Sequence, residues 1–144
     1  MSSQPSERAA VVGTVDPQTV NSTEKLTDAV DMSKWHEAMF ICLLGDMAAE
    51  TIDFKVKESD ASGGTYAALK SATQLAAHAS NNDNKQIVIN VKAEELSSGK
   101  RYLKGSLVTG GATGGPACVV ALGTVPRIGP ASDDDLADVV EIVS

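Results

Sequence analysis

Aromatic residues are scarce in this chain of 144 residues, which holds two phenylalanines, two tyrosines and one tryptophan. Hydrophobic residues still make up 42% of the sequence, so a core must be built mainly from valine, isoleucine, leucine and alanine. Such a core buries less apolar area per residue than an aromatic one. We therefore expect association with other subunits to contribute part of the stability.

Basic residues and long apolar runs are also few. Twelve lysines and arginines stand against nineteen acidic residues, for a formal net charge of −7, and the basic residues are scattered. That distribution argues against nucleic-acid binding. The longest apolar run, Ala38–Leu44, is far shorter than the roughly twenty residues of a membrane-spanning helix, so no membrane partner is expected. Because the first residues lack the pattern of a secretory signal, we expect synthesis in a cytoplasm.

Residues that carry catalysis or bind metals are sparse. The histidines His36 and His78 have no nucleophile and carboxylate at a recognisable spacing. The cysteines Cys42 and Cys118 lie within apolar runs, where we expect buried free thiols rather than a disulfide or a metal site. The segment Gly110–Gly115 lacks the lysine of a phosphate-binding loop and fits a hairpin loop. No catalytic, metal-binding or cofactor-binding residue is therefore predicted.

Alternation of apolar and polar residues is the clearest pattern that is present. In Thr51–Glu58 the side chains of Ile52, Phe54 and Val56 alternate with polar neighbours, which is typical of a strand with one buried face. Further strands are predicted at 36–44, 85–92, 101–109 and 116–122. Turn-forming residues separate these segments, and recurring strands with such turns predict an antiparallel sandwich or barrel.

The stretch 65–80 is ambiguous. Its many alanines favour a helix by propensity, with Leu69, Ala72 and Leu75 at partly helical spacing. Its flanking strands are of antiparallel type, however, and tertiary context can override propensity. Helix and extended chain are both left open here.

Both ends of the chain differ from its centre. Residues 1–28 are rich in polar residues with isolated valines, so we expect an N-terminal arm, then a β-sandwich domain at 29–130 and a C-terminal tail at 131–144. The tail's apolar residues fit a helix or an edge strand. The residues expected to contact partners are the apolar ones in both segments: Val11, Val12, Val15, Val20, Val139, Val140, Ile142 and Val143. The alternative is that these segments complete the chain's own sandwich.

Five blocks of sequence follow one another in a particular order. They are the apolar strand ending Leu43-Leu44-Gly45, the alternating Thr51–Glu58 with its loop, Ile87–Leu96, Arg101–Lys104 and Leu122–Arg127. In this order, over roughly residues 30–130, the chain resembles the cement, or decoration, proteins that bind the outside of tailed-bacteriophage capsids.

The resemblance implies an all-β, jelly-roll-like antiparallel sandwich in which 65–80 is partly extended. It implies no catalytic residue and no cofactor. The implied partners are the major capsid protein and a second copy of the chain in a homodimer, on the exterior of a virion assembled in the host bacterial cytoplasm. Two alternatives are another virion part, such as a head-tail joining or tail protein, and a carbohydrate-binding β-sandwich or small hydrolase. The scarcity of tyrosine and tryptophan argues against sugar binding.

Overall fold

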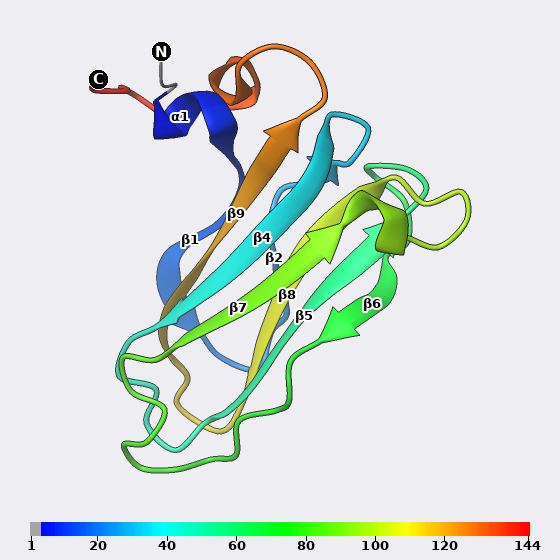
Figure 1. The fold of residues 1–144 in the computed structure, drawn as a ribbon. Helices are drawn as coiled ribbons and strands as arrows, with labels where there is room; N and C mark the ends of the chain where they lie inside the picture. Colours follow the sequence, from blue (N-terminus) through cyan, green and yellow to red (C-terminus); the bar gives the residue numbers. More distant parts are fainter. Residues whose placement is uncertain (1–3) are drawn as a thin grey trace.

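The computed structural model describes residues 4–144, which form strands of varied length joined by loops (Figure 1). The helices are one turn long: α1 (Pro5–Arg8) and the 3₁₀ helices η1 (Ala93–Glu95) and η2 (Ala131–Asp134). The strands are β1 (Ala9–Val20), β2 (Lys25–Leu26), β3 (Val30–Asp31), β4 (Trp35–Leu44), β5 (Thr51–Ser59), β6 (Ala67–Ser71), β7 (Gln86–Lys92), β8 (Tyr102–Gly110) and β9 (Gly115–Pro126).

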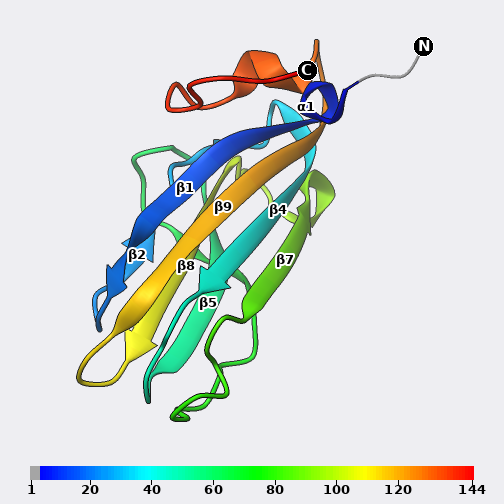
Figure 2. The same cartoon turned by 90° about the vertical axis from the view of Figure 1, so that its left-hand side faces the viewer.

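Two antiparallel sheets pack face to face. Sheet A has the strand order β1-β9-β4-β7, and sheet B has the order β2-β8-β5-β6 with β3 also pairing to β8. Figure 2 looks onto sheet A, with sheet B behind it. The predicted all-β antiparallel sandwich is confirmed. No helix within residues 4–144 is long and apolar enough to span a membrane.

The core lies between the sheets because alternate residues of each strand point inward. Ile52, Phe54 and Val56 of β5 are fully buried, as their alternation predicts. They meet side chains of the other sheet, among which Phe40 and Trp35 are the largest. Burying a side chain of this size contributes roughly 1.5–3 kcal/mol. The cost of ordering the backbone is roughly 1–2 kcal/mol per residue, so the whole core, and not a few residues of it, is needed to offset that cost.

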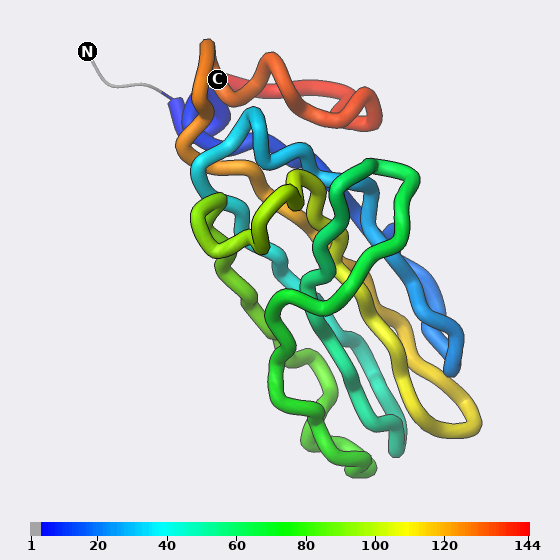
Figure 3. Tube along the Cα trace, turned by 90° about the vertical axis from the view of Figure 1, so that its right-hand side faces the viewer, coloured from blue at the N-terminus to red at the C-terminus, as the bar shows by residue number. Residues whose placement is uncertain are grey.

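The stretch 65–80 is extended where it contacts the body. β6 pairs with β5, and beyond it the N–H group of Ala72 donates to the carbonyl oxygen of Phe54 at 2.9 Å. Leu75 and Ile52 exchange two backbone hydrogen bonds of 3.0 Å. The open edge of β5 offers these bonds, and they replace the helix that the alanines favour. Figure 3 shows the rest of the segment continuing along the margin of the sandwich.

Most of the segment expected as an N-terminal arm belongs to the sandwich. β1 pairs with β9 from Ala9 opposite Thr124 to Val20 opposite Gly115. The side chains of Val12, Val15 and Val20 are buried in the core. For these three valines the alternative prediction is the correct one, because the segment completes the chain's own sandwich. Their side chains pack in the core and are not available to a partner.

The C-terminal tail is neither the helix nor the edge strand that its pattern predicts. After η2, Asp135 accepts a hydrogen bond from the Val11 N–H group at 2.7 Å, and Leu136 donates one to the Val11 carbonyl oxygen at 2.8 Å. The chain then turns, with the Val139 N–H group bonded to the Leu136 carbonyl oxygen. This turn ends the pairing with β1, so the apolar residues that follow lie over the end of the sandwich (Figure 2).

Candidate interaction surface

The strands at the centre of sheet A are apolar on both faces. In β4, Phe40 and Cys42 point into the core, whereas Met39, Ile41 and Leu43 point away from it and are partly exposed. β9 repeats the arrangement, with small buried residues inside and larger aliphatic ones outside. An antiparallel sheet with one solvated face normally alternates apolar with polar residues. This sheet departs from that pattern.

Strand register gathers the outward side chains into one surface. Met39 lies opposite Leu122, Ile41 lies between Val120 and Val88, and Leu43 lies opposite Cys118. Val11 of β1 extends the row beyond Leu122. We call this surface the outer face of sheet A, and its apolar members are Val11, Met39, Ile41, Leu43, Val88, Cys118, Val120 and Leu122. Val88 and Leu43 are the most exposed, at 51% and 40%.

Charged groups lie at the end of this face rather than in its middle. Glu37 and Lys92 are opposite each other on β4 and β7, and Thr124 of β9 lies beside Glu37. Along β4, β7 and β9 the other outward positions between that end and the loops are apolar or uncharged. The central part of the face therefore offers a partner no charge to neutralise.

The outer face of sheet B is polar by contrast. Asp53, Lys55 and Lys57 point outward from β5, as predicted for the polar side of the alternating strand. Glu24 accepts hydrogen bonds from Lys57 Nζ and from Ser106 Oγ, both at 2.5 Å, and these bonds lower the pKa of the Glu24 carboxyl. Side chains thus pair with one another across this face, which is suited to water.

The free edges of sheet A are partly occupied. On β1, the Thr14 N–H group donates to the Asp28 carboxylate at 3.1 Å, close to the bonds that Val11 makes with the tail. On β7, Lys70 from the other sheet donates to the Asn90 carbonyl oxygen at 2.8 Å and forms an ion pair with Glu95. Edge groups bonded in this way are less able to pair with a foreign strand.

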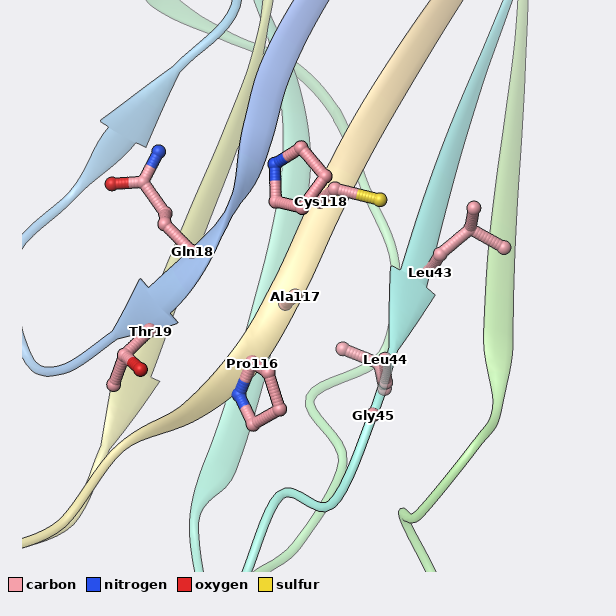
Figure 4. Close-up of a pocket in the computed structure, with 9 residues that line it drawn as sticks. Gln18, Thr19, Leu43, Leu44, Gly45, Pro116, Ala117 and Cys118 are labelled. Atoms are coloured by element: carbon pink, nitrogen blue, oxygen red, sulfur yellow. The ribbon is translucent and has the colours of Figure 1, made fainter.

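A shallow groove lies where β1, β9 and β4 approach the loops at one end of the outer face (Figure 4). Its walls include Gln18, Leu43, Gly45 and Pro116, and Cys118 lies within it. Both cysteines are free. Cys42 is buried as predicted, and burial raises the pKa of its thiol to about 12; Cys118, in contrast, is partly exposed on the outer face.

Apolar residues also gather at the end of the sandwich that carries the tail. Val140 and Val143 are 97% and 83% exposed, and Ile142 is also exposed, as is Ile128 after β9. Of the residues predicted to contact partners, the structure therefore exposes these three in the tail and places Val11 on the outer face of sheet A. Val139 is half-buried.

The outer face itself was missed at the sequence level. Its signal is the continuous apolar run in 39–44, which is typical of a strand covered on both sides. Identifying the exposed half of that run requires the register with β9 and β7. The partner-contact prediction named tail residues that the structure exposes, and it did not include Ile41 or Val120.

The histidines and acidic residues form no catalytic or metal-binding constellation in the described part of the chain. His78 Nδ1 accepts hydrogen bonds from the backbone N–H groups of Ser80 and Asn81, both at 3.2 Å, so it stabilises a turn. His36 is exposed on β4. No group of three or more potential metal ligands occurs within residues 4–144.

Comparison with known proteins adds little to this description. No family model and no curated protein matches the chain. Among solved structures, a Bacillus endospore appendage protein, from a family described as disulfide-linked pili, is similar with a TM-score of 0.46 and 14% identity. The match covers 87% of this chain and 97% of the appendage chain. A likeness of this degree carries no argument about function.

Proposed function

We propose that this chain is a non-enzymatic structural protein, a cement protein that binds the outer surface of a tailed-phage capsid and stabilises the lattice of the major capsid protein. The observation that supports it best is the outer face of sheet A, which joins Ile41, Val120 and Val88 into one apolar surface on a stable body. Contiguous apolar surface of this kind is characteristic of sites that bind other proteins.

A cement protein acts through area rather than through a reaction. It must contact more than one neighbour, and many copies on a lattice turn modest single contacts into strong overall binding. Two separate apolar surfaces, the outer face of sheet A and the exposed tail residues Val140 and Val143, meet that need. The proposed partners are the major capsid protein and a second copy of the chain, on the exterior of the virion.

The order of the sequence blocks supports the same function. It is similar to that of the cement protein of a Bordetella phage, including the alternating Thr51–Glu58 that forms β5. The polar outer face of sheet B would then face water, because Lys57 and Glu24 already satisfy each other there. Neither a nucleic acid nor a membrane is a proposed partner, in keeping with the net charge of −7.

The copy number per particle tests this proposal. Quantitative mass spectrometry of purified virions should find on the order of hundreds of copies, since a cement protein follows the symmetry of the whole lattice. About six or twelve copies would instead indicate a ring at the head-tail junction and would overturn the proposal. Absence from the particle would overturn it as well.

A further inference from the structure

The outer face of sheet A has no partner within the described chain. Its central residues, Ile41 and Val120, are apolar, whereas outward residues at the centre of a solvent-exposed sheet face are normally polar. The outer face of sheet B is more polar at the corresponding depth of the sandwich, where Lys55 lies opposite Ser106, with Leu26 on the other side of Ser106. The difference between the two faces therefore indicates that one of them is covered in the working form of the protein.

Charge distribution shows which partner the face suits. With a net charge of −7, two copies of this chain repel each other unless they meet where little charge lies. Along β4, β7 and β9 the outward charged residues are Glu37 and Lys92, which are opposite in sign and directly opposite in register. The part of the face formed by β4, β7 and β9 is therefore locally neutral, and it is the part of sheet A through which copies can approach. Negative charge begins at the β1 margin, where the Thr14 hydroxyl, opposite Val120, donates to the Asp16 carboxylate at 3.2 Å.

The size of the face agrees with a small two-fold interface. Strands lie roughly 4.8 Å apart and advance roughly 3.3 Å per residue, so four strands over the span Glu37–Leu43 cover roughly 450 Å² in plan. A pleated surface with side chains has more accessible area than its plan. Two such faces together cover roughly 900 Å² in plan and somewhat more as accessible area, near the lower limit of about 1,000 Å² for a specific interface.

The edges of the sheet favour stacking over strand pairing. Val11 and Thr14 of β1 already donate to carboxylates, and Lys70 already occupies the Asn90 carbonyl oxygen of β7. The face between these edges carries no such cover. Two twisted sheets stack with their strands within about 30° of each other and interdigitate their side chains, which a second copy of the same face can do.

We infer that the outer face of sheet A packs against the same face of a second copy, so that the dimer is a stack in which two sheets A form the centre. The role of this dimer rests on the proposed function: a dimer carries two tails and can therefore contact two capsid subunits. It leaves residues 137–144 of each copy free for the capsid.

Sedimentation equilibrium from about 1 to 100 µM tests the assignment with Val120→Lys and a matched control, Val108→Lys. Val120 points outward from the centre of sheet A, whereas Val108 points outward from sheet B opposite Asp53, where a lysine finds a favourable partner. The wild type should dimerise with a micromolar dissociation constant, which Val120→Lys should raise at least tenfold. Val108→Lys should leave it within about twofold.

Val88→Lys provides a second variant in case Val120→Lys folds poorly, since Val88 is half-exposed at the margin of the face and tolerates a lysine. It too should weaken the dimer. A wild type that stays monomeric up to 100 µM would overturn the inference, as would dimerisation of both face variants at the wild-type strength.

Binding to capsids separates this inference from the proposed function. Particles stripped of the protein should take up the wild type and Val108→Lys equally, and Val120→Lys more weakly because it binds as single copies. A monomeric wild type that still decorates the particles would contradict the dimer and leave the cement function standing. A dimer that ignores the particles would contradict the cement function and leave the dimer standing.

Discussion

The carboxylate of Glu50 accepts a hydrogen bond from the backbone N–H group of Gly114 in the interior of the protein. Glu50 precedes β5, and its Oε1 atom also accepts the N–H group of Thr113 at 3.1 Å. Its Oε2 atom lies against Gly111, where a Cβ atom would overlap it. The glycine-rich loop between β8 and β9 thus wraps around a carboxylate supplied by the chain itself.

Removing that carboxylate should destabilise the fold. Glu50→Ala leaves two N–H groups of the loop without their acceptor, so we expect the free energy of unfolding to fall by about 2–4 kcal/mol. Glu50→Gln keeps a carbonyl acceptor and should cost about half as much, because a neutral acceptor bonds more weakly. Urea unfolding measures both. Glu94→Ala, at an exposed glutamate, is the control and should change stability by less than about 0.5 kcal/mol.

Gly123 provides a test of packing in the core. A Cβ atom at this position of β9 would overlap the indole ring of Trp35, which is buried and rigid. Gly123→Ala should therefore lower the free energy of unfolding by about 1–3 kcal/mol and shift the fluorescence of the chain's one tryptophan. Gly63→Ala is the matched control, because a Cβ atom there meets nothing within 4 Å. Equal stability of the two variants would contradict the packing described.

The ion pair between Asp31 and Arg101 should make stability depend on acidity. Arg101 Nε and Nη2 donate to the two carboxylate oxygens at 2.8 Å each, and the Ser33 N–H group adds a third bond. The guanidinium bonds, as the largest cause, hold the pKa of Asp31 well below its usual range. A carboxylate with a lowered pKa stabilises the fold above its unfolded pKa, near 3.9, and loses that contribution as the pH falls further.

Asp31→Asn should accordingly reduce stability at pH 7 and matter less in acid. Because the Arg101 side chain is half-exposed, solvent screens the pair, and we expect a loss of about 1 kcal/mol rather than the full value of the shift. Thermal unfolding of both proteins from pH 7 to 2 should show the gap closing below about pH 4. A gap of constant size down to pH 2 would contradict this. Asp138→Asn, at an exposed position, should match the wild type at pH 7.

Strands with one buried face could be predicted closely from the sequence. The alternating segment Thr51–Glu58 forms β5, Thr51–Ser59. Its alternation of polar and apolar residues, with a period of two, can be recognised without knowing which strands pair with it. The segment 85–92 was found for the same reason and forms β7. In such strands the local pattern and the tertiary environment give the same answer.

β1 was missed for a physical reason. Its register with β9 shifts between Val11 and Gly13 and again between Val15 and Gln18. Each irregularity reverses which face the following residues occupy, so Val12 and Val15 are both buried although an odd spacing separates them. A strand interrupted in this way shows no clean period of two, and its isolated valines look like those of an unpaired arm.

The candidate surface depended even more on tertiary information. Sequence alone shows that 39–44 is apolar throughout, but a strand buried on both sides by its own chain gives the same run. Only the pairing of β4 with β9 and β7 shows that Ile41 points away from the core while Phe40 points into it. The exposed apolar residues of the tail could be named from the sequence, because either a helix or an edge strand there would present an apolar face.

Deleting residues 137–144 tests whether the tail contacts the capsid. Leu136 remains bonded to Val11, and the removed residues are mostly exposed, so the melting temperature should change by less than about 2 °C. Uptake by stripped particles should fall at least tenfold, because the exposed side chains of Val140 and Val143 are lost. Deleting residues 1–20 is no substitute, since it removes β1 and should unfold the protein.

The pair Val140→Ser and Val143→Ser refines this test without shortening the chain. Each serine removes apolar surface from a side chain that makes little contact with the rest of the protein, so stability should stay within about 0.5 kcal/mol of the wild type. Together they should reduce particle uptake part of the way toward the deletion, because Ile142 and Val139 remain. Uptake unchanged in both the serine pair and the deletion would assign capsid contact to another surface and leave the tail without a role in binding.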